Sequence, residues 1–185
     1  MFRQLLKAGE SSLVRWCDMS NDANQTHALL FICLGNICRS PLAKAIFVHQ
    51  ATQRGMLGRF KIDSCGTGGW HAGGPADPRS VMVAAKNGVT LEHVARQVCE
   101  DDFERFDLLL AMDQKNHSDL IDLGAPREKI KLFRSFDPTL ADVVAEGAMH
   151  KLDVPDPYYG GHDGFDRVYD MVWRASEGLL ARYAS

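Results

Sequence analysis

The sequence predicts an α/β fold, a small doubly wound sheet of four parallel strands with helices on both faces. Short apolar segments of strand length alternate along the chain with longer segments of helical periodicity. That alternation is typical of parallel strands joined by right-handed helical crossovers. The composition also suits a globular chain with a buried core, because 45% of the 185 residues are hydrophobic and 24% are charged.

Four apolar segments are interpreted as the strands of this sheet. The first, residues 29–33, is a continuous apolar run, which is typical of a strand covered on both faces. The other three strands are expected at residues 60–64, 107–112 and 129–133, and each interval leaves room for a helical crossover.

Four segments predict the helices between and after these strands. Ser40 and Pro41 precede an apolar pattern of helical spacing, and Ser at the N-cap with Pro at the first position is a common helix start. Residues 78–88 indicate a helix that ends at a glycine. A third helix is expected at 113–121, and a long amphipathic helix around 165–180 closes the chain.

The domain boundary is expected near residue 26. Residues 1–26 are polar and weakly patterned, so they are interpreted as an N-terminal extension with a short helix near 2–6, and residues 27–185 as one domain. The extension lacks the apolar stretch of a signal peptide. Five cysteines do not all pair within one chain, which favours reduced thiols and a cytoplasmic location.

Charge and hydropathy exclude two classes of partner. The 24 acidic residues outnumber the 21 Lys and Arg, and the formal net charge is −3, so the chain as a whole lacks the basic footprint of a nucleic-acid binder. The longest apolar run has seven residues, whereas a membrane helix needs about 20. We therefore expect neither nucleic-acid binding nor membrane insertion.

The segment after the first strand carries the candidate chemistry, because doubly wound sheets bind ligands beyond the carboxyl ends of their strands. Residues 33–41 are CLGNICRSP: a cysteine ends the strand, a short loop follows, and Arg39 precedes a helix. Backbone N–H groups that lead into a helix bind anions, and a guanidinium contacts two phosphate oxygens at once. The residues expected to bind phosphate are Leu34, Gly35, Asn36, Ile37, Cys38, Arg39 and Ser40.

The helix dipole and Arg39 also favour the thiolate form of Cys33, which would face the bound phosphoryl group as a nucleophile. The hydroxyl of Ser40 is placed to donate to the sulfur. The competing interpretation is a buried thiol at a strand end, and the strand-loop-helix context argues against it. The segment lacks the Gly-Lys-Ser/Thr end of a nucleotide P-loop, and no second pair of ligands completes a zinc site with Cys38, so no metal is expected.

This loop resembles the active-site loop of the low-molecular-weight protein-tyrosine phosphatases. The resemblance extends from about residue 28 to the C-terminus, and residues 1–26 have no counterpart in it. The further motifs that carry it are Asp63-Ser64 with Gly66-Thr67 and Trp70, HVARQ at 93–97, Met112-Asp113 with Asn116, and DPYYG at 156–160. The stretch from 138 to 154 is longer than is usual in that family.

The resemblance implies a cysteine-dependent hydrolase of phosphoric monoesters. It would act on phosphotyrosine in proteins, and on small aryl phosphates, through a phosphocysteine intermediate and without a cofactor. We expect phosphotyrosine-containing proteins as its partners and a monomer as its state.

Transfer of the phosphoryl group from a tyrosyl oxygen needs a general acid to protonate that oxygen. Three Asp-Pro pairs are candidates for this role: 77–78, 137–138 and 156–157. An Asp-Pro pair alone is ordinary turn chemistry. Asp156 differs because Tyr158 and Tyr159 follow it, and the resemblance points to the same residue. Asp156 is therefore expected to act as acid and then as base. The 77–78 pair is interpreted as a helix start, and the 137–138 pair as a turn after a strand.

Trp70, Tyr158 and Tyr159 are expected to line a slot for the aromatic ring of the substrate, since each lies on a glycine-containing loop. The competing interpretation is core packing. The resemblance assigns loop support to three polar residues, which are Asn36, Ser64 and His93. A left-handed conformation would be a reasonable use of asparagine.

Asp113 is expected either to brace Arg39 or to cap the helix that follows, and the sequence leaves both open. Cys38 is expected to form a reversible disulfide with Cys33 under oxidation, which would protect the nucleophile.

Three alternative functions compete with this interpretation. The first is a phosphoarginine phosphatase on the same fold. Related enzymes of that kind resemble one another in having threonine at the position of Ile37, so isoleucine favours phosphotyrosine as the substrate. A thioredoxin-coupled arsenate reductase needs a closely spaced downstream cysteine pair, and after Cys65 only Cys99 remains. A non-catalytic phosphotyrosine-binding module would have no use for a nucleophile and an acid.

Overall fold

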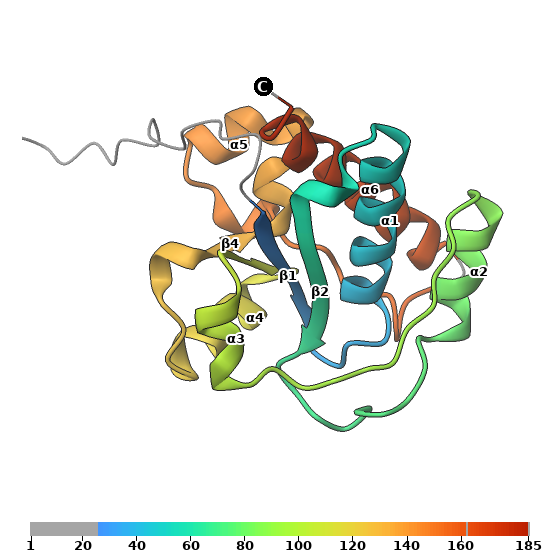
Figure 1. The fold of residues 1–185 in the computed structure, drawn as a ribbon, viewed down its shortest axis with the longest axis horizontal. Coiled ribbons are helices and arrows are strands. Elements are labelled where there is room, and N and C mark those ends of the chain that lie inside the picture. The colour runs from blue at the N-terminus through green and yellow to red at the C-terminus, as the bar shows by residue number, and fades with distance from the viewer. Residues whose placement is uncertain (1–25, 162, 185) are drawn as a thin grey trace, which may run out of the picture.

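The structure, a computed structural model, describes residues 26–161 and 163–184 and confirms the predicted fold class (Figure 1). One sheet holds four strands in the order β2-β1-β3-β4, and all three pairings are parallel. The strands are β1 His27–Cys33, β2 Phe60–Gly66, β3 Leu108–Ala111 and β4 Ile130–Leu132. The helix expected near 2–6 lies outside the described residues, as does all but the last residue of the expected extension.

The central strand β1 is covered on both faces, which explains its unbroken apolar sequence. Leu29 and Phe31 join one hydrophobic cluster, whereas Leu30 and Ile32 join a second cluster on the opposite face. All four side chains are fully buried. Burial of side chains of this size stabilises a fold by about 1.5–3 kcal/mol each, so the two clusters hold β1 firmly in place.

Helices cover both faces of the sheet, as Figure 1 shows. The first cluster contains residues of three helices, which are α1 Arg39–Gln53, α2 Pro78–Lys86 and α6 Gly164–Ala181. The second cluster contains residues of two helices, which are α3 Glu100–Arg105 and α4 Gln114–Asp122. The four predicted helices are therefore present, with α3 as an addition that is too short to show a periodic pattern.

The long stretch from 138 to 154 folds into short elements between β4 and the last helix. They are a 3₁₀ turn at Pro138–Leu140, α5 Ala141–Ala145 and a second 3₁₀ turn at Met149–Lys151. Further 3₁₀ turns occur at Leu57–Arg59, Arg127–Lys129 and Phe133–Phe136. None of the helices in the described part of the chain is long and apolar enough to cross a bilayer.

The start of α1 corrects one expectation. The sequence predicts Ser40 as the N-cap, but the helix begins at Arg39, its N-cap is Cys38, and no side chain caps it. The hydroxyl of Ser40 lies instead 3.0 Å from the sulfur of Cys33. An uncapped first turn keeps its N–H groups free of side-chain acceptors, and such groups bind anions. By contrast, Asp77 caps α2 as expected, because its side chain accepts from the N–H of Arg79.

Candidate active site

The loop after β1 wraps around the sulfur of Cys33. The sulfur is 3.0 Å from Oγ of Ser40, and it accepts a hydrogen bond from the backbone N–H of Asn36 at 3.3 Å. Among the described residues, Asn36 is the non-glycine residue with a positive φ, at 54°. This left-handed turn directs the loop back over the cysteine. The N–H of Asn36 thus points at the sulfur, and the hydroxyl of Ser40, which also lies 3.3 Å from the carbonyl oxygen of Cys65, is beside it.

The unusual conformation of Asn36 is held by four further contacts. Its Nδ2 donates to Oγ of Ser40 at 2.9 Å and to Oγ of Ser64 at 3.1 Å, and its Oδ1 accepts from the backbone N–H of Arg96 at 2.9 Å. Its carbonyl oxygen lies 2.7 Å from Nε2 of His93. Ser64 and His93, the two residues expected to support the loop, thus each contact Asn36. Asn36 and Ser40 are themselves fully buried.

His93 contacts the loop as a neutral ring. A carbonyl oxygen only accepts, so Nε2 of His93 carries the hydrogen in its contact with Asn36. Burial lowers the pKa of His93 below its usual value of 6.5. The neutral ring with Nε2–H is thus the form that holds the loop at neutral pH.

The guanidinium of Arg39 is buried and has fixed partners on two sides. Nη1 donates to Oδ2 of Asp113 at 2.5 Å and to the carbonyl oxygen of Val154 at 3.1 Å, and Nη2 donates to Oδ2 of Asp156 at 3.0 Å. The other carboxylate oxygen of Asp113 accepts from the N–H of Asn116 and caps α4. The two roles left open for Asp113 are therefore both present, because each uses a different oxygen.

The structure separates the three Asp-Pro pairs by their surroundings. Each aspartate faces a different arginine: Asp77 binds Arg79 at 2.8 Å, Asp137 binds Arg174 at 3.2 Å, and only Asp156 binds the arginine of the loop. The side chains of Asp77 and Asp137 are 8% and 0% exposed, whereas that of Asp156 is 39% exposed. Asp156 is thus the one of the three that faces both the loop and solvent.

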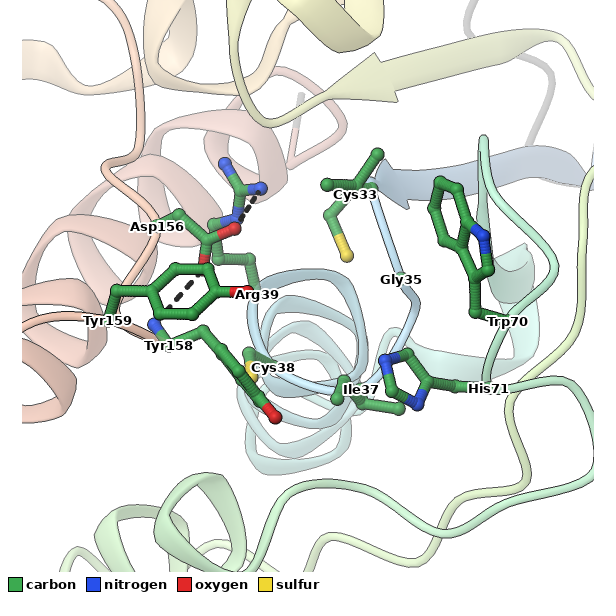
Figure 2. A pocket seen from close by; sticks show the side chains of 11 residues that line it. Cys33, Gly35, Ile37, Cys38, Arg39, Trp70, His71, Asp156, Tyr158 and Tyr159 are labelled. Atoms are coloured by element: carbon green, nitrogen blue, oxygen red, sulfur yellow. Dashed lines mark hydrogen bonds and ion pairs between the residues drawn. The ribbon is translucent and has the colours of Figure 1, made fainter.

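A cavity of about 410 Å³ opens over the sulfur. Figure 2 shows Cys33 between two walls, with Trp70 and His71 on one side and Tyr158 and Tyr159 on the other. Trp70 and Tyr159 are largely exposed, so these rings are not core residues. The loop residues that line the cavity are Leu34, Gly35, Ile37, Cys38 and Arg39. A cavity of this size with flat aromatic walls is suited to an aryl group.

Cys38 lies in the loop as a protonated thiol. Burial, and next the negative charge of Asp77, raise the pKa of Cys38 to about 12. Cys33 and Cys38 are both free cysteines in the structure.

Two residues at the site escaped the sequence interpretation. His71 lines the cavity, and its signal was its position next to Trp70. Arg79 lies in the first turn of α2, donates to the carbonyl oxygen of Tyr158 at 3.2 Å, and places its guanidinium 5.3 Å from the ring centre of that tyrosine. No local pattern distinguishes such an arginine from an ordinary helix residue. In the described part of the chain, no three His, Cys, Asp or Glu residues are grouped so that they could hold a metal ion.

Comparison with known proteins places this geometry in one family. The model of the low molecular weight phosphotyrosine protein phosphatases matches residues 28–185. A low molecular weight protein-tyrosine-phosphatase of Streptomyces coelicolor is 47% identical over 160 residues, which cover 84% of this chain and 93% of the relative.

Solved structures agree with the sequence comparison. A protein tyrosine phosphatase from Entamoeba histolytica matches with a TM-score of 0.76 and 36% identity, over 85% of this chain and 96% of that one. An arginine phosphatase from Drosophila matches with a TM-score of 0.73 and 30% identity, over 85% of this chain and 98% of that one. The family model spans the sheet from residue 28 onward, the loop of Cys33 and the segment of Asp156. This chain therefore belongs to the low-molecular-weight phosphotyrosine protein phosphatase family.

Proposed function

We propose that this protein hydrolyses phosphotyrosine in proteins, and small aryl phosphates, with Cys33 as the nucleophile. The observation that carries the proposal is the meeting of three groups in one aromatic-walled cavity. These groups are the hydrogen-bonded sulfur of Cys33, the buried guanidinium of Arg39 and the half-exposed carboxyl of Asp156. The relatives named as protein-tyrosine phosphatases support the same reaction class.

In the first step, the thiolate of Cys33 attacks phosphorus and the bond from phosphorus to the tyrosyl oxygen breaks. The N–H groups of the loop and the guanidinium of Arg39 bind the non-bridging phosphate oxygens, whose charge distribution changes in the transition state. Asp156 gives its proton to the departing tyrosyl oxygen, so that tyrosine leaves as a neutral phenol. The products of this step are tyrosine and a phosphocysteine.

In the second step, water attacks the phosphocysteine and the bond from sulfur to phosphorus breaks. Asp156, now ionised, takes a proton from that water, and inorganic phosphate leaves. The hydroxyl of Ser40, at 3.0 Å from the sulfur, stabilises the thiolate as it departs. Asp156 lines the same cavity as the sulfur of Cys33 and is part-exposed, so that water has access to it in the second step.

The walls of the cavity favour an aromatic substrate. Trp70, Tyr158 and Tyr159 present flat faces or edges at the mouth, and Ile37 gives the loop an apolar side chain beside them. The likeness to an arginine phosphatase keeps phosphoarginine as the second candidate substrate. Ile37 argues against it, since it offers no hydroxyl to the polar guanidine of such a substrate.

We also propose that oxidation joins Cys33 to Cys38 in a reversible disulfide. The active form then requires a reducing compartment, which agrees with a cytoplasmic location. We further propose that the protein is a monomer. Arsenate reduction has no support from the remaining cysteines of the domain. Cys65 is fully buried in the core, and Cys99 lies at the N-cap of α3, so the two do not form a closely spaced pair downstream of the loop.

A comparison of two variants tests the proposed mechanism. Cys33→Ser should abolish turnover of p-nitrophenyl phosphate and keep vanadate binding, because the loop amides and Arg39 remain. Asp156→Ala should slow phenyl phosphate hydrolysis by roughly 10²–10⁴, the usual contribution of general acid catalysis. The loss on p-nitrophenyl phosphate should be smaller in single-turnover measurements, since nitrophenolate leaves without a proton.

Three outcomes would contradict the proposal. Turnover by Cys33→Ser above a tenth of the wild-type rate would exclude this cysteine as nucleophile. Equal losses on both substrates with Asp156→Ala would place the acid elsewhere, and Asp113 would be mutated next. Faster hydrolysis of phosphoarginine than of phosphotyrosine by the wild type would favour the second candidate substrate.

A further inference from the structure

A second hollow of about 550 Å³ lies between α2 and the start of α6. We call it the α2–α6 groove. Its apolar lining consists of Met82, Val83 and Phe165, and its charged lining consists of Arg79, Lys86 and Asp166. Val83 and Phe165 are buried and belong to the core cluster, whereas Met82 is 68% exposed. The groove takes no part in the phosphate chemistry.

The groove adjoins the active-site cavity through the segment that follows the general acid. Tyr158 and Tyr159 line the cavity, and the next two residues, Gly160 and Gly161, line the groove. Arg79 lines the groove from α2, and its guanidinium lies 5.3 Å from the ring centre of Tyr158. The two hollows thus adjoin where Tyr158, which lines the cavity, contacts Arg79, which lines the groove.

The groove is within reach of a peptide whose phosphotyrosine occupies the cavity. An extended chain advances about 3.3–3.6 Å per residue, so a residue one to three positions away lies about 3–11 Å further along the surface. A protein substrate must lay its flanking residues on the surface around the cavity. The groove is a concave surface beside that mouth, on the side of Tyr158.

The charges of the groove are already paired, which selects the chemistry of its occupant. Nη2 of Arg79 lies 2.8 Å from Oδ2 of Asp77, and Nζ of Lys86 lies 2.6 Å from Oδ1 of Asp166. Each pair is close to neutral, so an added acidic or basic side chain gains less electrostatic attraction from it than from a lone charge. An apolar side chain would instead remove Met82 from water, and methionine adapts its shape to different partners.

We propose that the α2–α6 groove binds an apolar side chain of the substrate protein, one to three residues from the phosphotyrosine. The proposal rests on the proposed function and adds a sequence preference to it. An apolar contact of this kind changes kcat/KM by roughly 10-fold. Small aryl phosphates do not extend to the groove, so their hydrolysis is independent of it.

The test compares phosphotyrosine peptides that carry Leu, Asp, Lys or Ala at each of the three positions on either side. With the wild type, we expect Leu at one position to raise kcat/KM by roughly 10-fold over Ala, Asp and Lys. Met82→Lys should remove this preference and leave p-nitrophenyl phosphate hydrolysis unchanged. The matched control is Val81→Lys, because Val81 is 39% exposed on the same helix and does not line the groove.

Flat kcat/KM values across the peptides would overturn the proposal, as would a preference for Asp or Lys. So would a Leu preference that survives in both Met82→Lys and Met82→Gln, the second variant being uncharged and compatible with a helix. Equal effects of Met82→Lys and Val81→Lys would also refute it. Failure of the wild type to hydrolyse p-nitrophenyl phosphate is a separate result, which would overturn the proposed function. Binding of the same peptides to Cys33→Ser then tests the groove without turnover.

Discussion

Replacing Asn36 with alanine is expected to damage the phosphate-binding loop more than any other single change to a residue outside the cavity. Asn36→Ala removes three side-chain hydrogen bonds, of which those to Ser40 and Ser64 are buried and that to the backbone of Arg96 is part-buried. At about 1 kcal/mol each, these bonds contribute about 3 kcal/mol to the free energy of unfolding. The φ of 54° adds roughly 1 kcal/mol more, because alanine pays a steric penalty in the left-handed region.

The assay combines urea unfolding with steady-state hydrolysis of p-nitrophenyl phosphate. If the loop keeps its shape, Asn36→Ala loses about 4 kcal/mol of stability. If the loop relaxes, the N–H of residue 36 turns away from the sulfur of Cys33, and kcat falls instead. Asn36→Gly is the matched control, because it loses the same three bonds but adopts a positive φ freely. It should be roughly 1 kcal/mol more stable than the alanine variant if the loop is retained.

One result would refute this reasoning. Suppose that the free energy of unfolding of Asn36→Ala lies within about 1 kcal/mol of the wild type, which is the contribution of one hydrogen bond, and that kcat is unchanged. The hydrogen bonds of Asn36 would then not hold the loop. The buried hydroxyls of Ser40 and Ser64 would then be satisfied in another way.

Three further predictions concern neighbouring groups. Arg39→Lys should lower both phosphate affinity and kcat, because a point charge does not replace a two-pronged guanidinium, and near-normal kinetics would make the arginine peripheral. Mild peroxide should inactivate the enzyme, and a thiol reductant should restore it through a disulfide of Cys33 and Cys38; peptide mapping that finds sulfonic acid on Cys33 instead would exclude this protection. Burial lowers the pKa of His93 below 6.5, so the folded state binds this proton more weakly than the unfolded state, and stability should fall as pH drops through 6.5. His93→Gln should flatten that fall in urea unfolding between about pH 7 and pH 5, and an unchanged slope would assign it to other groups.

The sequence predicted the sheet and the loop because their information is local. The strand β1 is a short apolar run, and the loop that follows it holds its backbone N–H groups and Arg39 within one segment. Nine consecutive residues, CLGNICRSP, therefore carry most of the proposed phosphate site. The elements that escaped prediction are short: α3 has six residues and α5 has five, which is too few for a periodic pattern.

The start of α1 shows how a local rule fails when tertiary contacts compete. Ser40 is a good N-cap by propensity, but its hydroxyl contacts the sulfur of Cys33 and accepts from Asn36. The helix accordingly begins one residue earlier, without a side-chain cap. A bond to a group seven residues away in sequence thus overrides the preference of the residue itself.

The fold class, the loop that contains Cys33 and Arg39, and three candidates for the general acid follow from local patterns in the sequence. What each of the three Asp-Pro carboxylates binds depends instead on tertiary contacts. Asp77 and Asp137 pair with Arg79 and Arg174, which lie outside the loop, while Asp156 reaches the loop arginine from 117 positions along the chain. The physical reason is that a carboxylate takes its chemistry from the charges and solvent around it, and those neighbours are assembled only when distant segments pack together.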